Sequence, residues 1–451
     1  MANDEGDGTM ATYDYDVLYI GSGHGTFDGA IPLAAKGVHV GIIEADLIGG
    51  TCPNRGCNAK ITLDAPVELQ RRAEALSGIV TGQLGIDWSQ NMAHKHQVID
   101  DLPNFINGLL ESVGIKVLHG YGQLVDAHTV AVGDQQVTAD KIVIATGLRP
   151  HRLAIPGTDL AHDSSDFMNL TELPANITII GAGYIAMEFA TIANAAGAKV
   201  TMIMRGDKAL RRYHQPFVEA IISDLEKRGV RFMRHTQVTA IEQADQQVHV
   251  VTDQDETLTT DWVLDATGRI PNIENLGLEK VGVVTTEHGI KVNSHLRTTV
   301  DNIYASGDVL DKKQPRLTPT AIFESMYLSR KFAGESDAPI DYPAIPSVVF
   351  TSPRIAKVGV SIEAAEKDGL TIEKHDVLDD WYRHVNKERF GQNALIFDQG
   401  HHLVGATEVS DRADDVINTL LPAIALKLDK EQIGRIVTLF PTIGSSAWGQ
   451  L

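Results

Sequence analysis

The sequence predicts an α/β fold class with two Rossmann-like dinucleotide-binding domains and a C-terminal α+β domain. Two observations support this prediction. A pattern of strand, glycine-rich turn, helix and strand begins at Tyr15 and returns at Ile177, which indicates a repeated dinucleotide-binding unit. The composition then changes near Asp341, and the chain that follows is long enough for a separate domain. The 451 residues are sufficient for roughly three domains.

The composition limits the classes of function. The chain is 43% hydrophobic and has a formal net charge of -20, so it lacks the cationic surface that nucleic acid or an anionic membrane requires. No continuous apolar run is long enough to span a bilayer. Residues 1–13 are acidic, lack the apolar core of a secretory signal, and are predicted to be a disordered tail. We therefore expect a cytoplasmic protein with neither a nucleic-acid nor a membrane partner.

The first glycine-rich turn follows an apolar strand at residues 15–20. Gly21 permits a tight turn, and Gly23 permits the backbone to approach a pyrophosphate at the N-terminus of the next helix. Glu44 ends the next strand, where a carboxylate accepts hydrogen bonds from a ribose. Thr26 departs from the small residue usual at the third position of the pattern. Any tight strand-to-helix turn can use glycine, but Glu44 favours the dinucleotide interpretation.

The second turn has small residues at all three positions of the pattern, namely Gly181, Gly183 and Ala186. The strand that follows ends in Arg205 rather than in an acid, and Arg211 comes shortly afterwards. Arginines suit the 2′-phosphate of NADP, whereas an acidic residue suits the free 2′-hydroxyl of NAD. The alternative is a pair of solvated surface arginines. We predict that this domain binds NADPH.

The only two cysteines, Cys52 and Cys57, lie in the stretch GGTCPNRGCNAK. In a cytosolic protein such a pair favours a cycle between dithiol and disulfide over a structural link, although two inert buried cysteines are the plain alternative. A zinc site usually needs four Cys or His ligands, and this stretch has two cysteines and no histidine, so no metal site is predicted. Gly49 and Gly50 favour a sharp turn into a helix at Thr51, which would place thiols near a helix N-terminus.

Three further apolar strands end in or next to glycine. The run Lys141–Pro150 is predicted to be a buried strand stopped by Gly147. The stretch WVLDATGRIPN repeats the Ala-Thr-Gly sequence and ends near Asn272, and a third strand ends in Gly307 and Asp308. Asp308 has the alternative role of a simple turn former.

In this order the motifs resemble those of the flavoprotein disulfide reductases, the family of glutathione reductase, dihydrolipoamide dehydrogenase and mercuric reductase. The resemblance covers nearly the whole chain and includes GGTCxNxGC, two Ala-Thr-Gly strands and a YAxGD segment. It implies an FAD-binding domain interrupted by an NADPH-binding domain, followed by a dimerisation domain. The boundaries that we predict are 14–152 and 273–338 for the FAD domain, 153–272 for the NADPH domain and 339–451 for the dimerisation domain.

The resemblance also implies residue roles toward the two cofactors. Gly21, Gly23 and Glu44 are expected to contact FAD, and Asp308 its ribityl chain. The stretch Arg205–Arg211 is similar to the 2′-phosphate site of NADPH-using glutathione reductases. The remaining cofactor contacts that we predict are Gly50, Thr51, Thr146, Gly147, Gly181, Gly183, Ala186 and Gly268.

Five residues match the catalytic positions of the family. Cys57 resembles the thiol that meets the flavin, and Cys52 the interchange thiol that attacks the substrate. Lys60 and Glu188 resemble the ion pair beside flavin N5, and Tyr184 the ring that covers the nicotinamide pocket. The plain alternatives are an ordinary ion pair and a core aromatic residue.

The C-terminus departs from the family pattern. Disulfide-reducing members usually end in HPTxxE, whose His, from the partner subunit and oriented by the Glu, is the general acid and base. Here the matching stretch is FPTIGS, with Phe440 in place of the His and Ser445 in place of the Glu. Loss of a positioned acid typically costs about 10²- to 10⁴-fold in rate. Tyr382 and His384 are candidate substitutes, with surface polar residues as the alternative.

Three classes of function remain after this departure. The first is transfer of electrons from NADPH through flavin and the cysteine pair to a small-molecule disulfide similar to glutathione disulfide. The second is reduction of a non-disulfide acceptor such as a quinone, a metal ion or oxygen. The extra C-terminal cysteine pair of mercuric reductase is absent here. The third is a redox-sensing flavoprotein with little turnover.

The resemblance further implies a homodimer, because the C-terminal domain of related enzymes completes the active site across a twofold axis. The apolar helix predicted at Val416–Leu428 is a candidate interface face, with packing into its own domain as the alternative.

Overall fold

The computed structural model describes residues 13–451, so the predicted tail lies almost entirely outside the described residues. The described chain forms two compact units. The first contains the chain up to Asn54 together with Asp101–Arg149 and Ile270–Asp341, and the second contains Arg55–Asp100, Pro150–Arg269 and Tyr342–Leu451. Each unit is discontinuous in sequence, as expected when one domain interrupts another.

The first unit is built on a mixed sheet with strand order β3-β2-β1-β6-β5-β4, in which β18 also pairs with β6. Strands β3, β2, β1, β6 and β18 run parallel, whereas β4 and β5 add an antiparallel extension to the first half of β6. The strands are β1 (Tyr15–Ile20), β2 (Val40–Glu44), β3 (Lys116–His119), β4 (Gly122–Leu124), β5 (Thr129–Val132), β6 (Gln135–Ile144) and β18 (Ile303–Ala305).

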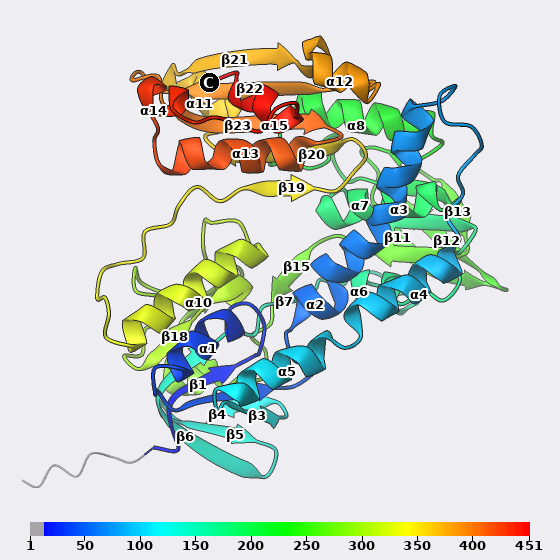
Figure 1. Ribbon diagram of the computed structural model, residues 1–451. Helices are drawn as coiled ribbons and strands as arrows, with labels where there is room; N and C mark the ends of the chain where they lie inside the picture. The colour runs from blue at the N-terminus through cyan, green and yellow to red at the C-terminus, as the bar shows by residue number, and fades with distance from the viewer. Residues whose placement is uncertain (1–12) are drawn as a thin grey trace, which may run out of the picture. The chain divides into compact units, whose positions relative to one another are not determined.

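Helices cover this sheet because its central strands are apolar on both faces. Leu18, Ile42 and Val143 are fully buried, which is typical of a parallel sheet between two layers. Helices α1 and α10 lie side by side in Figure 1, and Gly29 in α1 lets the backbone of Ser325 in α10 approach closely. The helices are α1 (Phe27–Ala34), α5 (Leu102–Ser112) and α10 (Thr318–Phe332).

The second unit contains the second nucleotide-binding pattern as an all-parallel sheet of order β10-β9-β8-β14, accompanied by an antiparallel sheet of order β11-β12-β13. The repeat that the sequence predicts at Ile177 therefore forms a second Rossmann-like sheet. Its elements are β8 (Asn176–Ile180), α7 (Tyr184–Ala195), β9 (Lys199–Ile203), α8 (Gln215–Lys227), β10 (Arg231–Met233), β11 (Val238–Ala244), β12 (Gln247–Thr252), β13 (Thr257–Thr260) and β14 (Trp262–Asp265).

The C-terminal part of the same unit is an antiparallel sheet of order β19-β20-β23-β22-β21. Helix α13 packs on β20 and β23 (Figure 1), and its apolar residues Val416, Leu420 and Ile424 are buried there. For this apolar face, the structure therefore supports the alternative of packing into its own domain. The elements are β19 (Ser347–Val349), β20 (Arg354–Gly359), α11 (Ile362–Asp368), β21 (Thr371–Asp376), α12 (Trp381–Val385), β22 (Gln392–Phe397), β23 (Leu403–Ser410), α13 (Ala413–Ala425), α14 (Lys430–Gly434) and α15 (Ile443–Trp448).

The stretch with the two cysteines forms two consecutive helices, α2 (Thr51–Arg55) and α3 (Cys57–Ala75). As predicted, the chain enters the first helix at Thr51 after two glycines with positive φ, Gly49 at +94° and Gly50 at +69°. Helix α3 packs on α4 (Trp88–Ile99) within the second unit. Between residues 13 and 451, no helix is both long and apolar enough to cross a membrane.

Candidate active site

In both glycine-rich turns, the first glycine lies too close to a carbonyl oxygen to carry a side chain. A Cβ on Gly21 would lie 2.5 Å from the carbonyl oxygen of Ala145, and a Cβ on Gly181 would lie 2.3 Å from that of Ala266. Both glycines also have positive φ, +101° and +123°. The first glycine of each turn is therefore required by the fold itself, because it packs against the Ala-Thr-Gly sequence that follows a neighbouring strand.

The second glycine of each turn is different. The nearest atom to a Cβ on Gly23 would be 3.9 Å away, and a Cβ on Gly183 would meet no heavy atom within 4 Å. Nothing in the fold therefore excludes a side chain at these two positions. Both positions are thus compatible with close approach of a ligand to the backbone, such as the pyrophosphate of a dinucleotide.

The other residues predicted to contact FAD gather around the first turn. Glu44 Oε2 accepts the backbone N–H of Ser22 at 2.9 Å, which fixes the carboxylate beside the turn. A Cβ on Gly25 would lie 3.3 Å from the oxygen of Ser306, two residues before Asp308. The turn, Glu44 and the Asp308 segment thus lie together in the first unit, and this arrangement fits FAD. Thr146 Oγ1 donates to the carbonyl oxygen of Asn272 at 2.6 Å, close to the same strand end.

The two arginines of the second nucleotide-binding unit lie beside its turn. The N–H of Leu210 donates to the carbonyl oxygen of Ala182 at 2.9 Å, so the segment after β9 is held against the turn. A Cβ on Gly206 would lie 3.0 Å from a guanidinium nitrogen of Arg211, which places that guanidinium over the segment. Arg205 and Arg211 are both exposed. Both side chains are therefore accessible to a phosphate group in solution.

The cysteines occupy different positions along their helices. Cys57 is exposed and is the first residue of the 19-residue helix α3, whereas Cys52 is half-buried in the short helix α2. The N-terminus of a long helix is a position that stabilises negative charge. No group of three or more His, Cys, Asp or Glu side chains suited to a metal ion occurs between residues 13 and 451.

Lys60 and Glu188 form the ion pair that the sequence predicts. Lys60 Nζ lies 3.2 Å from Glu188 Oε1, and both side chains are largely buried. Lys60 is on α3, one turn after Cys57, and Glu188 is on α7, one turn after the exposed ring of Tyr184. Two helices of the second unit therefore bring the pair together, and the glycine-rich turn before α7 lies at the same end of that helix.

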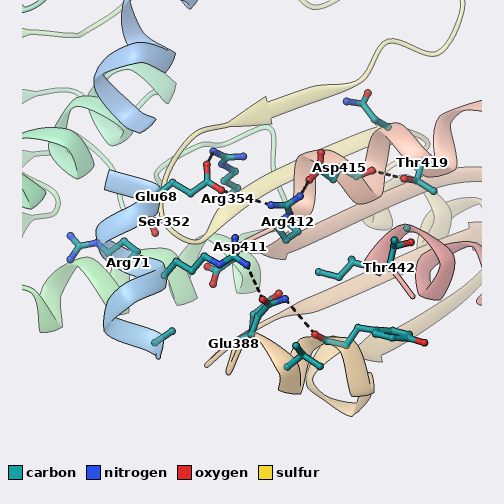
Figure 2. A pocket seen from close by; sticks show the side chains of 18 of the residues that line it. Glu68, Arg71, Ser352, Arg354, Glu388, Asp411, Arg412, Asp415, Thr419 and Thr442 are labelled. Atoms are coloured by element: carbon teal, nitrogen blue, oxygen red, sulfur yellow. Dashed lines mark hydrogen bonds and ion pairs between the residues drawn. The ribbon is translucent and has the colours of Figure 1, made fainter. Parts of the chain in front are cut away.

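A cavity of about 760 Å³ adjoins this region in the second unit. Figure 2 shows Glu68 reaching from α3 toward Arg354 and Arg412, whereas the Arg71 side chain points away from them. Burial raises the pKa of Asp64 to about 7 and that of Glu388 to about 7. The charged residues that line the cavity are Asp64, Glu68, Arg71, Arg72, Arg354, Glu388, Asp411, Arg412 and Asp415.

The two C-terminal positions that depart from the family motif carry no ionisable side chain. Phe440 is 72% exposed and its ring makes an edge contact with Tyr382, with 5.8 Å between the ring centroids. Ser445 Oγ is 2.8 Å from Thr438 Oγ1. His384 Nε2 bonds the carbonyl oxygen of Leu378. Of the two substitutes suggested by the sequence, only Tyr382 lies next to Phe440.

Comparison with known proteins identifies the class. A family model described as pyridine nucleotide-disulphide oxidoreductase matches residues 15–325, and the dimerisation-domain model of the same family matches residues 345–449. The chain belongs to this family, as the resemblance in its motifs predicted. It carries the nucleotide-binding and dimerisation domains of a flavoprotein oxidoreductase, and family members use FAD and NAD(P)H.

Individual relatives cover almost the full length. Glutathione reductase of Nostoc sp. is 32% identical, with 96% of this chain and 98% of the relative aligned. Dihydrolipoyl dehydrogenase of Chlamydia muridarum is also 32% identical, over 97% of this chain and 96% of the relative. Among solved structures, the HOCl-induced flavoprotein disulfide reductase RclA from Escherichia coli superposes with a TM-score of 0.87 and 26% identity, over 96% of this chain and 98% of that chain. The same protein has also been solved as a Cu(II) complex.

Three side chains around the Lys60–Glu188 pair were missed from the sequence. Phe350 donates its backbone N–H to Glu188 Oε1 at 2.9 Å. Arg354 lies near the Phe350 ring, and Asp64 lies near Arg354. Phe350 lies 162 residues from Glu188, so no local pattern joins them. Asp64 did carry a signal, because Cys57, Lys60 and Asp64 recur at the spacing of one helix face.

Proposed function

We propose that this protein is an NADPH-dependent FAD flavoprotein that reduces a small-molecule disulfide similar to glutathione disulfide. The observation that carries the proposal is the arrangement on α3, where Cys57 begins the helix and Lys60, paired with Glu188, lies one turn further. A thiol at the start of a helix, where a thiolate is favoured, is thus followed one turn later by a buried cation. The two cysteines, five positions apart in sequence, then act as the redox pair.

The preference for NADPH rests on Arg205 and Arg211. Both are exposed beside the turn at Gly181–Gly183, and no acidic residue ends β9 to bind a free ribose hydroxyl. A guanidinium presents paired donors to phosphate and keeps its charge at any physiological pH. Discrimination against NADH would follow because NADH would leave both arginines without the phosphate.

The residues of the cysteine pair have complementary tasks. Bound FAD would accept hydride from NADPH and supply the electron pair that reduces the enzyme disulfide. Cys52, as a thiolate, attacks one sulfur of the acceptor disulfide and releases the first thiol. Cys57 then attacks Cys52, which restores the enzyme disulfide and releases the second thiol. Each departing thiolate takes a proton, and this is the step that Phe440 cannot assist.

A non-disulfide acceptor is the second candidate, and the observation that favours it is Phe440 itself. The Phe440 side chain is 72% exposed, so its ring can contact an apolar acceptor but cannot donate a proton. A quinone or a metal ion takes electrons without a leaving thiolate, so it does not need the missing histidine. The Cu(II) complex of the structurally similar RclA makes a copper ion a reasonable test acceptor.

The deciding experiment is anaerobic NADPH oxidation by the purified FAD-loaded protein with glutathione disulfide, with a quinone and with Cu(II). Wild type is compared with Cys52→Ser, and Cys57→Ser is the matched variant on the other side of the pair. We expect disulfide-dependent oxidation that both substitutions abolish. Quinone or Cu(II) reduction that survives Cys52→Ser, together with no disulfide turnover, would overturn the first candidate in favour of the second.

A further inference from the structure

Phe350 holds both members of the Lys60–Glu188 pair. Its backbone N–H donates to the same Glu188 oxygen, Oε1, that Lys60 Nζ contacts, at 2.9 Å and 3.2 Å respectively. Its ring centroid lies 3.3 Å from Lys60 Nζ. The ammonium therefore lies between a carboxylate and the face of an aromatic ring, and both contacts are favourable for a cation. Phe350 follows strand β19, so a fixed backbone segment determines the position of the pair.

A second cation lies near the same ring. The guanidinium carbon of Arg354 is 5.1 Å from the Phe350 centroid. Its nitrogens lie 2.6 Å from Asp414 Oδ2 and 2.8 Å from Glu68 Oε2, and the Arg354 side chain is only 11% exposed. Arg354 lines the cavity (Figure 2), so the Phe350 ring lies near both Lys60 and a charge at the cavity wall.

Asp64 completes the cluster from helix α3. It follows Lys60 by one turn, is 3% exposed, and has Oδ2 3.7 Å from Arg354. The surrounding charges are Lys60 and Glu68 on α3, Glu188 on α7 and Arg354 on β20, the last of which also binds Asp414 on α13. Burial raises the pKa of Asp64 to about 7, so its charge changes in the neutral range.

We propose that Phe350, together with Asp64 and Arg354 behind it, positions the Lys60–Glu188 pair and adjusts its charge, and thereby sets how readily the bound flavin is reduced. The inference rests on the proposed function only in requiring a flavin beside Lys60. A reduced flavin carries additional electron density, which a fixed ammonium stabilises. Ionised Asp64 offsets part of the positive potential of Lys60, whereas protonated Asp64 leaves it intact.

The first test is Phe350→Leu, which keeps the backbone donor to Glu188 and removes only the ring. The rate of flavin bleaching by NADPH is measured by anaerobic stopped flow without any acceptor, so a failure with disulfides does not affect it. We expect at least a tenfold slower rate. Phe397→Leu is the control, because Phe397 is a buried aromatic of β22 in the same sheet. An equal rate in wild type and Phe350→Leu would overturn the role of the ring.

The second test is Asp64→Asn, which keeps the shape and removes the charge change. In wild type, the rate and the flavin midpoint potential are expected to fall between pH 6 and pH 8 by more than the ordinary proton dependence, because Asp64 ionises. In Asp64→Asn this additional fall should be absent, and the potential at pH 8 should be higher than in wild type. The potential is measured by reductive titration with dithionite, so it does not depend on NADPH binding.

Glu68→Gln is the matched control for Asp64→Asn. Glu68 also binds Arg354, but its side chain is 42% exposed at the cavity. The pH profile of Glu68→Gln should resemble that of wild type. If it is flattened as much as in Asp64→Asn, or if Asp64→Asn leaves both rate and potential unchanged, Asp64 does not set the charge at the pair. Retention of FAD and the circular dichroism spectrum show that each variant is folded.

Discussion

At the scale of single residues, Phe440 and Ser445 separate this chain from the disulfide-reducing pattern that its motifs otherwise follow. The ring of Phe440 contacts Tyr382, and the hydroxyl of Ser445 contacts that of Thr438. Neither residue carries an ionisable side chain. Thr442 caps α15 by accepting the N–H of Ser445.

Restoring the two side chains tests their importance. The double variant Phe440→His with Ser445→Glu should raise glutathione disulfide turnover by about tenfold or more, since a positioned acid contributes roughly 10²- to 10⁴-fold. The measurement is kcat for NADPH oxidation with glutathione disulfide. Phe440→His alone, which lacks the orienting carboxylate, should recover less. A double variant no faster than wild type would mean that protonation of the departing thiolate does not limit turnover.

The two arginines beside the second glycine-rich turn determine the predicted cofactor preference. Replacement of both Arg205 and Arg211 by Gln should raise KM for NADPH by about 10- to 100-fold, since a hydrogen bond to a charged group contributes roughly 1.5–3 kcal/mol. KM for NADH should change little. Arg231→Gln is a suitable control, because Arg231, on β10, is paired with Glu256, which precedes β13. Equal losses with NADPH and NADH would argue against a 2′-phosphate site.

At the scale of elements, the two strand-turn-helix units use their glycines for different reasons. Gly21 and Gly181 have positive φ and lie against a carbonyl oxygen. A Cβ on Gly23 would make only ordinary contacts at 3.9 Å, and a Cβ on Gly183 would meet no heavy atom within 4 Å. The fold therefore explains the first glycine of each turn, whereas the second stays a predicted ligand contact. The sequence pattern alone does not separate these two reasons.

Two alanine variants distinguish these roles. Gly21→Ala should lower stability by about 1–3 kcal/mol through strain and its contact with Ala145. Gly23→Ala should leave the apoprotein stability within about 0.5 kcal/mol, as for a substitution without a clash, but should reduce FAD content. Thermal unfolding of the apoprotein and the ratio of flavin to protein absorbance are the measurements. Full FAD content in Gly23→Ala would contradict close approach of the cofactor.

The C-terminal sheet contains a second buried charge cluster with a predicted pH dependence. Arg383 binds Glu388 at 3.0 Å and Glu408 at 2.8 Å. Burial raises the pKa of Glu388 to about 7, so the folded protein holds a proton there that the unfolded chain releases above about pH 4.5. Stability should therefore fall as the pH rises from 5 to 7. In Glu388→Gln the fall in Tm over this range should be smaller than in wild type.

At the scale of the whole molecule, the dimerisation domain leaves an apolar segment exposed. Val437 is 96% exposed, Leu439 79% and Phe440 72%, while the apolar face of α13 is buried in its own domain. Apolar side chains grouped in this way indicate a protein-protein interface. We therefore propose that this segment, rather than α13, contacts a second copy of the chain.

A charged double variant tests this surface. Wild type is expected at about twice the chain mass of 48.9 kDa. Val437→Asp with Leu439→Asp should shift the protein toward the monomer, because two carboxylates would have to be buried in the interface. Sedimentation velocity gives the mass. Leu47→Asp, at a half-exposed position in the other unit, is the control, and a dimeric Val437→Asp/Leu439→Asp variant would rule out this segment.

Much of the fold was predictable because its signals are local. Strand β1 has the predicted bounds, and the repeat at Ile177 forms the expected second sheet. The glycine-rich turns and the order of motifs also predicted the family, since each occupies a few adjacent residues. Helix α13 was predicted as a helix with its environment left open, because an apolar face is equally compatible with a core and with an interface. The structure packs this face into its own domain.

By itself, the sequence determined the fold class, the redox cysteines as candidates, and the absence of the usual His and Glu at Phe440 and Ser445. Only the tertiary structure showed that Phe350 binds Glu188 and places its ring against Lys60, and that Asp64 and Arg354 adjoin them. The physical reason is sequence separation. Turns and helix periodicity are set by neighbouring residues, whereas the charge around a buried pair depends on side chains that chain folding brings together from distant segments.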